Sequence, residues 1–317
     1  MANALGTLFG DIASAIREKT GDTATMKPAE FPEKIAAIEA GGGGGALPAG
    51  AYLSASSVRP HITYPYKRFV LNGVLYATAS NNGADWAISN IYKWNGSTWS
   101  TVLTSNSTTG INGTTISNRS YNIAEFNGKI HFVDRKKHAT FDGSSLVLLN
   151  DLPYSTYGTC LCVYQNKLVC YMYGSGKLYE WVESGDTWKE IATIGSQNQY
   201  LYIAAINDVM YVFDSSKAYH FEDGVLVQCG TTKQGYATMV ARNNKVYSLN
   251  MQTYYCRLFE YDPVTNTEKF WELPPIAASA FTYGGDEFSF MGAGTSPNSN
   301  VTQRFPCYVV NIVEDTV

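Results

Sequence analysis

The feature that most constrains the fold is a unit that recurs about every forty residues from Tyr66 onward. Each unit begins with a polar turn rich in Asn and Gly and a short apolar run, as in NGVLYAT at Asn72 and NGKIHFV at Asn127. Successive turns are 55, 38, 42, 36 and 41 residues apart, and an aromatic run such as LYEWVESGDTW follows in each unit. Several short strands per unit at this spacing are typical of the blades of a β-propeller.

The second unit shows the expected blade most clearly. Its runs YNIAEF, KIHFV, HATF and SLVLLN are joined by NG, DRKK and DGS, which predicts four antiparallel strands. Six such units predict a mainly β chain folded as a six-bladed β-propeller, with five or seven blades as alternatives. The sixth unit, from about Ala277, supplies only three strands before Val317. We expect AGAYLSASSV, which begins at Ala49, to add the fourth strand and to close the ring.

The repeats resemble those of Kelch-like propellers. The run EYDPVTNTEKFWELPP, from Glu260 to Pro275, comes closest to that family's motif. Most units lack the paired glycines expected in the second strand of a Kelch blade, so the resemblance implies the blade architecture and leaves the subfamily open.

A short helical segment precedes the repeats. Apolar residues at three- and four-residue steps predict one helix that ends near Gly21, and Pro32 suits the start of a second that ends near Gly41. We therefore expect a helical module at 1–40, a glycine tether at 41–46 and the propeller at 47–317. Helices this short are unstable alone, so they are expected to pack on each other and on a partner; a self-contained hairpin is the alternative. The apolar residues assigned to attachment are Leu5, Leu8, Phe9, Ile12, Ile16, Phe31, Ile35 and Ile38.

The same segment, IASAIREKTGDTATMKPAEFPEKIAAI, resembles a short N-terminal module of bacteriophage structural proteins of the tail and fibre type, often in phages of Gram-positive gut bacteria. The resemblance covers about a tenth of the chain. It implies attachment or assembly on a virion, in contact with other virion proteins. The implied localisation is the virion, assembled in the bacterial host cytoplasm, and a homo-oligomer on the particle is expected.

Composition excludes several classes of function. The formal net charge of −4 disfavours nucleic-acid binding through a broad basic field. No apolar run is long enough for membrane insertion, and the N-terminus lacks the apolar block of a signal peptide. The six cysteines show no CxxC spacing, which favours buried reduced thiols, as in a protein that folds in a reducing cytoplasm, over disulfides or metal.

The sequence carries few signs of catalysis. Its four histidines are assigned to different units, without ligand spacing on one element, so neither a metal nor a cofactor is expected. No GxSxG, HExxH or phosphate loop occurs. SGDTW at Ser184 echoes the Asp-box of sialidases, but it falls at a turn where such boxes are structural. A glycosidase needs only two carboxylates, so hydrolysis remains an alternative. The candidates are Asp85, Asp134, Asp151 and Asp214.

The long connections between strands are predicted to share one face, opposite the NG-type turns. Aromatic and amide side chains on such loops suit stacking on sugar rings and hydrogen bonding to hydroxyl groups. The alternative is that these aromatic residues only pack the loops. The candidate ligand contacts are Trp86, Tyr154, Tyr157, Tyr254 and Tyr255, with Arg304 as an anion anchor.

Together these features predict a non-enzymatic virion protein with a helical anchor and an outward-facing propeller. Its expected role is receptor binding or adhesion to a host surface glycan, with avidity from many copies on one particle. A capsid or tail decoration protein without a ligand and a glycan depolymerase are the alternatives. A cellular Kelch-type scaffold is disfavoured by the helical module.

Overall fold

A computed structural model describes the strands of the repeat region and most of their connections. By its internal contacts the chain divides into one unit of Met1–Gly50 with Ile312–Val317 and a second of Ala51–Asn311. The described residues are Ala13, 50–55, 65–79, 87–105, 110–111, 123–154, 159–214, 216–231, 239–252, 255–273, 278–284, 287–292 and 307–313.

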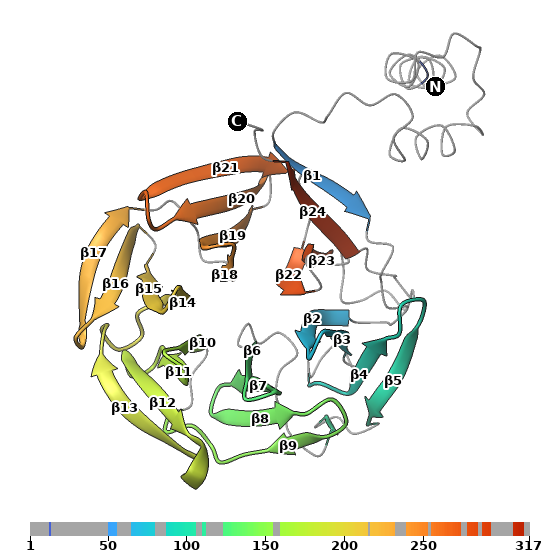
Figure 1. Cartoon of the computed structure of the whole chain (residues 1–317), viewed down its shortest axis with the longest axis horizontal. Helices are drawn as coiled ribbons and strands as arrows, with labels where there is room; N and C mark the ends of the chain where they lie inside the picture. Colours follow the sequence, from blue (N-terminus) through green and yellow to red (C-terminus); the bar gives the residue numbers. More distant parts are fainter. Residues whose placement is uncertain are drawn as a thin grey trace. The chain divides into compact units, whose positions relative to one another are not determined.

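The second unit is a mainly β propeller, in which four-stranded sheets surround a common centre (Figure 1). Five of the sheets consist of four strands that are consecutive in sequence, and we call them blades one to five. Blade one contains β2 (Pro65–Leu71), β3 (Val74–Ala79), β4 (Asn90–Trp94) and β5 (Trp99–Thr104). Blade two contains β6 (Ile123–Phe126), β7 (Lys129–Asp134), β8 (Lys137–Phe141) and β9 (Leu146–Leu148). Blade three contains β10 (Thr159–Tyr164), β11 (Lys167–Met172), β12 (Lys177–Val182) and β13 (Thr187–Thr193). Blade four contains β14 (Tyr202–Ile206), β15 (Val209–Phe213), β16 (Lys217–Glu222) and β17 (Val225–Thr231). Blade five contains β18 (Met239–Arg242), β19 (Lys245–Gln252), β20 (Tyr255–Asp262) and β21 (Thr267–Leu273).

The remaining four strands form a composite sheet from both ends of the repeat region. The last three, β22 (Ala278–Gly284), β23 (Glu287–Gly292) and β24 (Cys307–Val313), are joined at the outer edge by β1 (Gly50–Ala55), in the order β1-β24-β23-β22. The sequence predicted six blades; the structure shows five blades, each of four consecutive strands, and a composite sheet that holds the other strands. The prediction that the strand after the tether pairs with the last strand is confirmed.

Two-residue hairpins set the register of each blade. In blade one, Asn72 and Gly73 have φ values of 51° and 74°, and the pairing ends with Leu71 opposite Val74. Positive φ at both central residues is the geometry of a type I′ turn, whose twist matches that of the strands and which favours Asn and Gly. Equivalent turns join the first two strands of blades two to five, at Asn127–Gly128, Gln165–Asn166, Asn207–Asp208 and Asn243–Asn244. The repeating polar turn of the sequence is therefore the inner hairpin of each blade.

The hydrophobic core lies between neighbouring blades, where sheet faces pack on each other. Between blades one and two, the rings of Phe69 and Phe132 are 5.6 Å apart and those of Tyr76 and Phe141 are 5.3 Å apart, both edge-to-face. Val169 and Leu178 of blade three pack with residues of blade four. The blade-four side of that seam contributes Ile203, Met210 and Val212. Because adjacent blades share these seams, each blade depends on its neighbours for burial.

The predicted N-terminal module lies outside the described residues, apart from Ala13, which has helical backbone and is buried. Its two helices and the glycine tether therefore remain predictions. The same holds for the attachment residues Leu5, Leu8, Phe9, Ile12, Ile16, Phe31, Ile35 and Ile38. Within the described ranges, no helix is long and apolar enough to span a membrane.

Candidate functional site

Three connections of blade three gather at one end of its sheet, which we call the loop end. They are the β9–β10 connection, of which 149–154 is described, the β11–β12 turn (173–176) and the β13–β14 connection (194–201). The type I′ turn at Gln165–Asn166 joins the first two strands. Because strand direction alternates in an antiparallel sheet, that turn lies at the opposite end from the loop end.

Hydrogen bonds fasten the β13–β14 connection to the β11–β12 turn. The backbone N–H groups of Ile194 and Gly195 each donate to the Gly176 carbonyl at 3.0 Å, and that of Asn198 donates to the Tyr173 carbonyl at 2.8 Å. From the core side, the Tyr171 hydroxyl donates to the Gln199 carbonyl at 2.7 Å. The connection is therefore held in one conformation against its own blade.

This loop bears an exposed aromatic pair. The rings of Tyr173 and Tyr200 lie 4.3 Å apart with an interplanar angle of 38°, and Tyr200 is 48% exposed. A hydrogen bond between the two hydroxyl groups raises the pKa of Tyr173. Tyr154 is 42% exposed, and its ring lies 6.4 Å from that of buried Tyr179. Tyr179 packs in the core cluster shared with blade two, whereas Tyr173 packs in the cluster shared with blade four. Tyr154 and Tyr200 thus lie on either side of the blade-three sheet, at its loop end.

Charged groups beside these rings are paired. Lys177 donates to Glu190 at 2.8 Å, and this interaction raises the pKa of Lys177. Asp151 lies 2.8 Å from Lys137 and 3.3 Å from Lys136, and the bond from Lys137 is the main cause of the lowered pKa of Asp151. The loop end therefore carries compensated charges beside apolar ring surface.

The ligand contacts predicted from the sequence are only partly described. Tyr154 is exposed at the loop end, in agreement with its assignment to a surface loop. Tyr255 begins β20, opposite Gln252, at the hairpin equivalent to the β11–β12 turn, and only its backbone is described. The other candidates, Trp86, Tyr157, Tyr254 and Arg304, lie outside the described residues.

Tyr173 and Tyr200 were not among the ligand contacts predicted from the sequence. A signal was present, since the loop GSQNQY from Gly195 ends in Tyr200. The sequence could not show that Tyr173 packs against this ring, because the contact joins residues from two connections of the blade.

The carboxylates proposed for hydrolysis have structural partners. Asp151 is bound by two lysines, and its lowered pKa is the opposite of what a general acid needs. The Asp214 carboxylate accepts from the backbone N–H groups of Ser216 and Lys217 at 2.7 and 2.6 Å. Asp134 ends β7 opposite Lys137, and Asp85 lies outside the described residues. The described carboxylates therefore give no support to the depolymerase alternative.

The assignment of the histidines to different units was wrong for one pair. His131 on β7 and His138 on β8 belong to blade two and are fully buried, with His131 Nδ1 and His138 Nε2 2.9 Å apart. They share one sheet face because the two-residue turn at 135–136 folds β8 back along β7, with Val133 opposite His138. Burial lowers the pKa of His131 to about 4 and that of His138 to about 3, so both are neutral at pH 7. In the described part of the chain, no group of three or more His, Cys, Asp or Glu residues could hold a metal ion.

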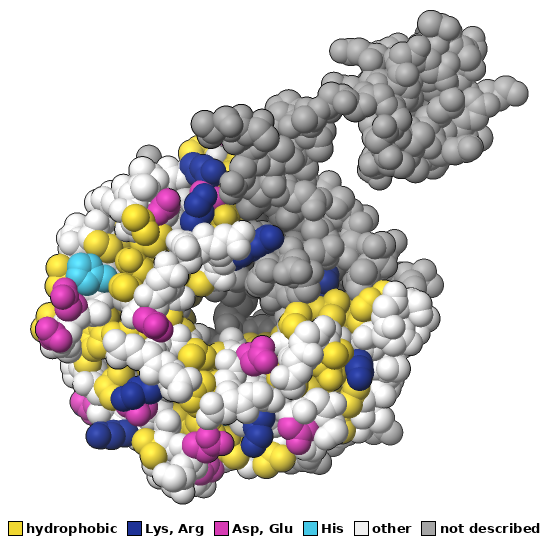
Figure 2. Space-filling view, in the orientation of Figure 1, with side chains coloured by type: hydrophobic (Ala, Val, Ile, Leu, Met, Phe, Trp, Pro, Cys, Tyr) yellow, Lys and Arg dark blue, Asp and Glu magenta, His cyan; other side chains and the backbone are white. Residues whose placement is uncertain are grey.

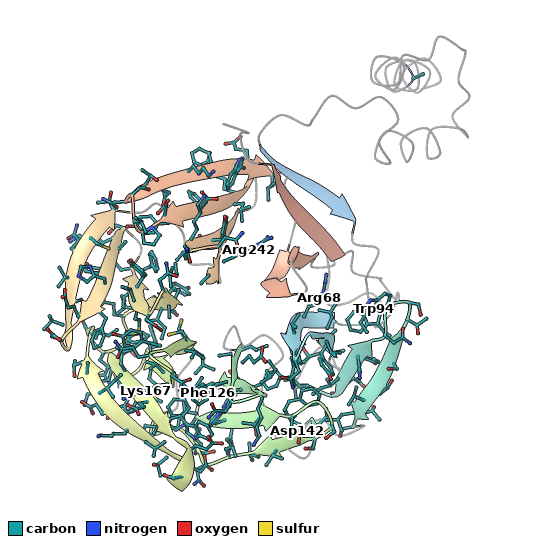
Figure 3. The ribbon with its side chains drawn as sticks, viewed as in Figure 1. Arg68, Trp94, Phe126, Asp142, Lys167 and Arg242 are labelled. Atoms are coloured by element: carbon teal, nitrogen blue, oxygen red, sulfur yellow. The ribbon has the colours of Figure 1, made fainter. Side chains whose placement is uncertain are left out.

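Aromatic rings of blade three enclose the histidine pair, and we call this region the histidine seam. The Trp181 ring lies 4.8 Å from His131 and 5.3 Å from His138, and the Trp188 ring lies 5.2 Å from His138. Phe126, at the end of β6, completes the seam at 6.4 Å from Trp181 (Figure 3). Rings of two blades thus bury the imidazoles between them.

Polar contacts fasten the same two blades. The Asn127 side chain donates to Glu183 at 2.8 Å, and the Asn150 backbone N–H donates to the Asp186 carboxylate at 2.7 Å. The Trp181 indole N–H donates to the other Asp186 oxygen at 3.2 Å. Asp186 belongs to the SGDTW turn, so this turn has the structural role expected of it. Asn150, at the start of the β9–β10 connection, is therefore used in packing between the two blades.

Four of the cysteines are described, and all are free thiols. Burial raises the pKa values of Cys160, Cys162 and Cys170, which suppresses thiolate formation. Among the described cysteines, Cys162 and Cys170 are buried as expected, whereas Cys160 and Cys229 are partly buried; Cys256 and Cys307 have undescribed side chains.

Basic and acidic side chains are interspersed over the face shown in Figure 2, around a central opening. Arg68 on β2 and Arg242 at the end of β18 come from the strands nearest the centre (Figure 3). Both take part in interactions with their surroundings, so neither is an unpaired cation for a ligand in the opening. The exposed tyrosines of blade three remain the better-defined candidate site.

No protein-family model matches the chain, and no curated protein matches it. Two similar solved structures are of the extracellular domain of BT4673 from B. thetaiotaomicron. One has a TM-score of 0.46 and 8% identity over 76% of this chain and 32% of that one. The other has a TM-score of 0.47 and 9% identity over 75% of this chain and 32% of that one. Kuenenia stuttgartiensis hydrazine synthase has a TM-score of 0.46 and 10% identity, covering 62% of this chain and 63% of that one.

The chain spans about a third of the length of the two BT4673 structures. At TM-scores below 0.5, these similarities carry no argument about a ligand or an activity.

Proposed function

We propose that this chain is a binding protein of a bacteriophage virion, attached through its N-terminal helices, with a propeller that presents loops to a host surface glycan. The observation that carries the binding role is the pair of exposed tyrosine faces, Tyr154 and Tyr200, on fastened connections of blade three. Rigid aromatic side chains offer a large contact area at a low cost in conformational entropy. The virion attachment rests on the resemblance of the N-terminal segment.

The proposal includes a closed ring in which the composite sheet is a sixth, Kelch-like blade. Support comes from the backbone contacts of β22, which reaches β2 of blade one and β19 of blade five. Closure would leave no gap between the first and last blades and would cover the sheet faces that such a gap exposes. Other virion proteins and further copies of the chain are the proposed partners, and avidity on the particle offsets weak single sites.

Cosedimentation tests the binding role. Purified full-length chain is mixed with intact cells from a panel of Gram-positive gut bacteria and with their isolated wall glycan, and bound protein and released reducing ends are measured. We expect retention without release. Release of reducing ends would replace the proposal with a depolymerase, and neither retention nor release would leave a decoration role.

A deletion tests the attachment role separately. Removal of residues 1–45 keeps β1 and all later strands, so the propeller is expected to unfold at an unchanged temperature. The shortened protein should no longer join the particle when it is produced in infected cells. Incorporation at the full-length level would refute attachment through the helices.

A further inference from the structure

We infer that the loop end of blade three is a stacking site for an uncharged pyranose oligosaccharide, with Tyr200 as its main contact and Tyr154 as its second. The inference rests on the proposed glycan-binding function and names its site and ligand class. It depends on three properties of the loop end: ring exposure, rigidity and charge.

Exposure distinguishes these two rings from most of the chain's aromatic residues. Most described aromatic side chains lie in the seams, whereas Tyr154 and Tyr200 are 42% and 48% exposed. An exposed ring face is apolar, and the axial C–H groups of a pyranose can pack flat against it while its hydroxyl groups stay in water. The hydroxyl groups of Tyr173 and Tyr200 add donors and acceptors at the edge of the same surface.

Rigidity reduces the cost of binding. Tyr200 follows a loop in which the Gln199 backbone N–H donates to the Ser196 carbonyl at 3.2 Å and the Ser196 N–H donates to the Gln199 side chain at 2.9 Å. Tyr173 lies directly beneath the neighbouring ring at 4.3 Å, which restricts its rotation. A ligand therefore meets a ring that is already ordered, so little entropy is lost on binding.

Charge selects the class of sugar. The two lysines described above at the loop end, Lys177 and Lys137, are bound to Glu190 and Asp151 at 2.8 Å. An acidic sugar would have to compete with these carboxylates for a cation, whereas a neutral sugar leaves both pairs intact. The site therefore favours uncharged hexoses or N-acetylhexosamines over uronic or sialic acids.

The test uses the full-length chain on an array of neutral oligosaccharides of glucose, N-acetylglucosamine, galactose, mannose and rhamnose, beside oligogalacturonate and sialylated oligosaccharides. Binding to at least one neutral sugar is expected, and its affinity is then measured by calorimetry. Tyr200→Ala should weaken this affinity about tenfold, and Tyr154→Ala should weaken it about threefold, each through lost stacking. Tyr200→Phe keeps the ring and should stay within about twofold of the original affinity.

Phe270→Ala is the matched control, because this ring is 47% exposed but lies on β21 of blade five. It should bind as tightly as the unaltered chain. Equal binding by Tyr200→Ala, or binding only to acidic sugars, would overturn the inference. If cells retain the chain but no neutral sugar binds, this site assignment fails and the adhesion role stands; if neither cells nor sugars bind, both fail.

Discussion

Blade three carries aromatic side chains in two settings, one facing blade two and one at its loop end. In the histidine seam, Trp181 is 7% exposed and packs against both His131 and His138. At the loop end, Tyr200 leaves nearly half of its surface in water although it also packs on another ring. The type of residue alone therefore does not tell whether an aromatic ring is buried in a seam or exposed to a ligand. What decides it is whether the ring lies on a strand facing the next blade or on a connection at the loop end.

The two regions also differ in how their polar atoms are satisfied. In the seam, His138 Nδ1 and the Trp188 indole nitrogen are buried and have no hydrogen-bond partner among the described residues. At the loop end, the polar atoms of the connection are paired within the blade or reach water. Burial of unpaired polar atoms costs free energy, so part of the stability gained from packing in the seam is offset by these atoms.

The largest effect should come from truncating the seam. Trp181→Ala removes a buried indole and leaves a cavity between two blades, so we expect the free energy of unfolding to fall by about 3–5 kcal/mol. Tyr200→Ala, its counterpart at the loop end, should change it by about 0.5 kcal/mol or less. Urea unfolding of both variants at pH 7 measures the difference. Similar losses for the two would remove the distinction between packing and exposed rings.

Acid should weaken the seam before it affects the loop end. The pKa values of His131 and His138 are lowered by burial to about 4 and about 3, so below pH 6.5 the unfolded chain binds more protons than the folded one. The contribution of the two neutral histidines to the free energy of unfolding is therefore fully present above pH 6.5. It is lost progressively as the pH falls from 6.5 to these folded-state pKa values. Each histidine contributes a slope of at most about 1.4 kcal/mol per pH unit.

Groups around the pair modify this response. Glu183 raises the pKa of His131, which opposes the effect of burial, and Lys129 lowers it. The double variant His131→Phe, His138→Phe removes both titrating groups and should flatten the loss of unfolding free energy between pH 6.5 and 5, where few carboxylates titrate. His220→Phe, which alters a partly exposed histidine beside Glu222, is the control and should keep the slope. An unchanged slope in the double variant would show that the seam is not the acid-sensitive element.

The contrast between local and long-range information explains what the sequence could predict. The inner hairpins were predictable because Asn72–Gly73 and its equivalents encode a turn within two residues. The pairing of β1 with β24 followed from a strand missing at the end of the last unit. The His131–His138 contact was missed because both residues had to be placed on one sheet face across a hairpin.

Candidate ligand residues were harder to predict than the fold. Tyr154 was selected because it is an aromatic residue in a long polar connection between strands, and it is exposed. Tyr200 was not selected, because its suitability as a ligand contact depends on packing against the Tyr173 ring and on the hydrogen bonds that hold residues 194–199. Such properties arise from contacts between connections and have no signature within either connection.

The last prediction tests whether sugar binding depends on the conformation of the fastened loop in addition to the exposure of the rings. Gly176 has φ of +70°, and an added Cβ would overlap the Gly195 carbonyl oxygen, so Gly176→Ala should strain the backbone and separate the two connections. Gly224 has φ of +85° with open space around it, so Gly224→Ala carries the backbone strain alone. We expect losses of about 2 kcal/mol for Gly176→Ala and about 1 kcal/mol for Gly224→Ala in urea unfolding.

Only Gly176→Ala should also weaken binding to a neutral oligosaccharide, because it displaces the carbonyl that holds Ile194 and Gly195 and so moves Tyr200 away from Tyr173. Undiminished sugar binding by Gly176→Ala would mean that ring exposure suffices and that the fastened loop contributes nothing to recognition.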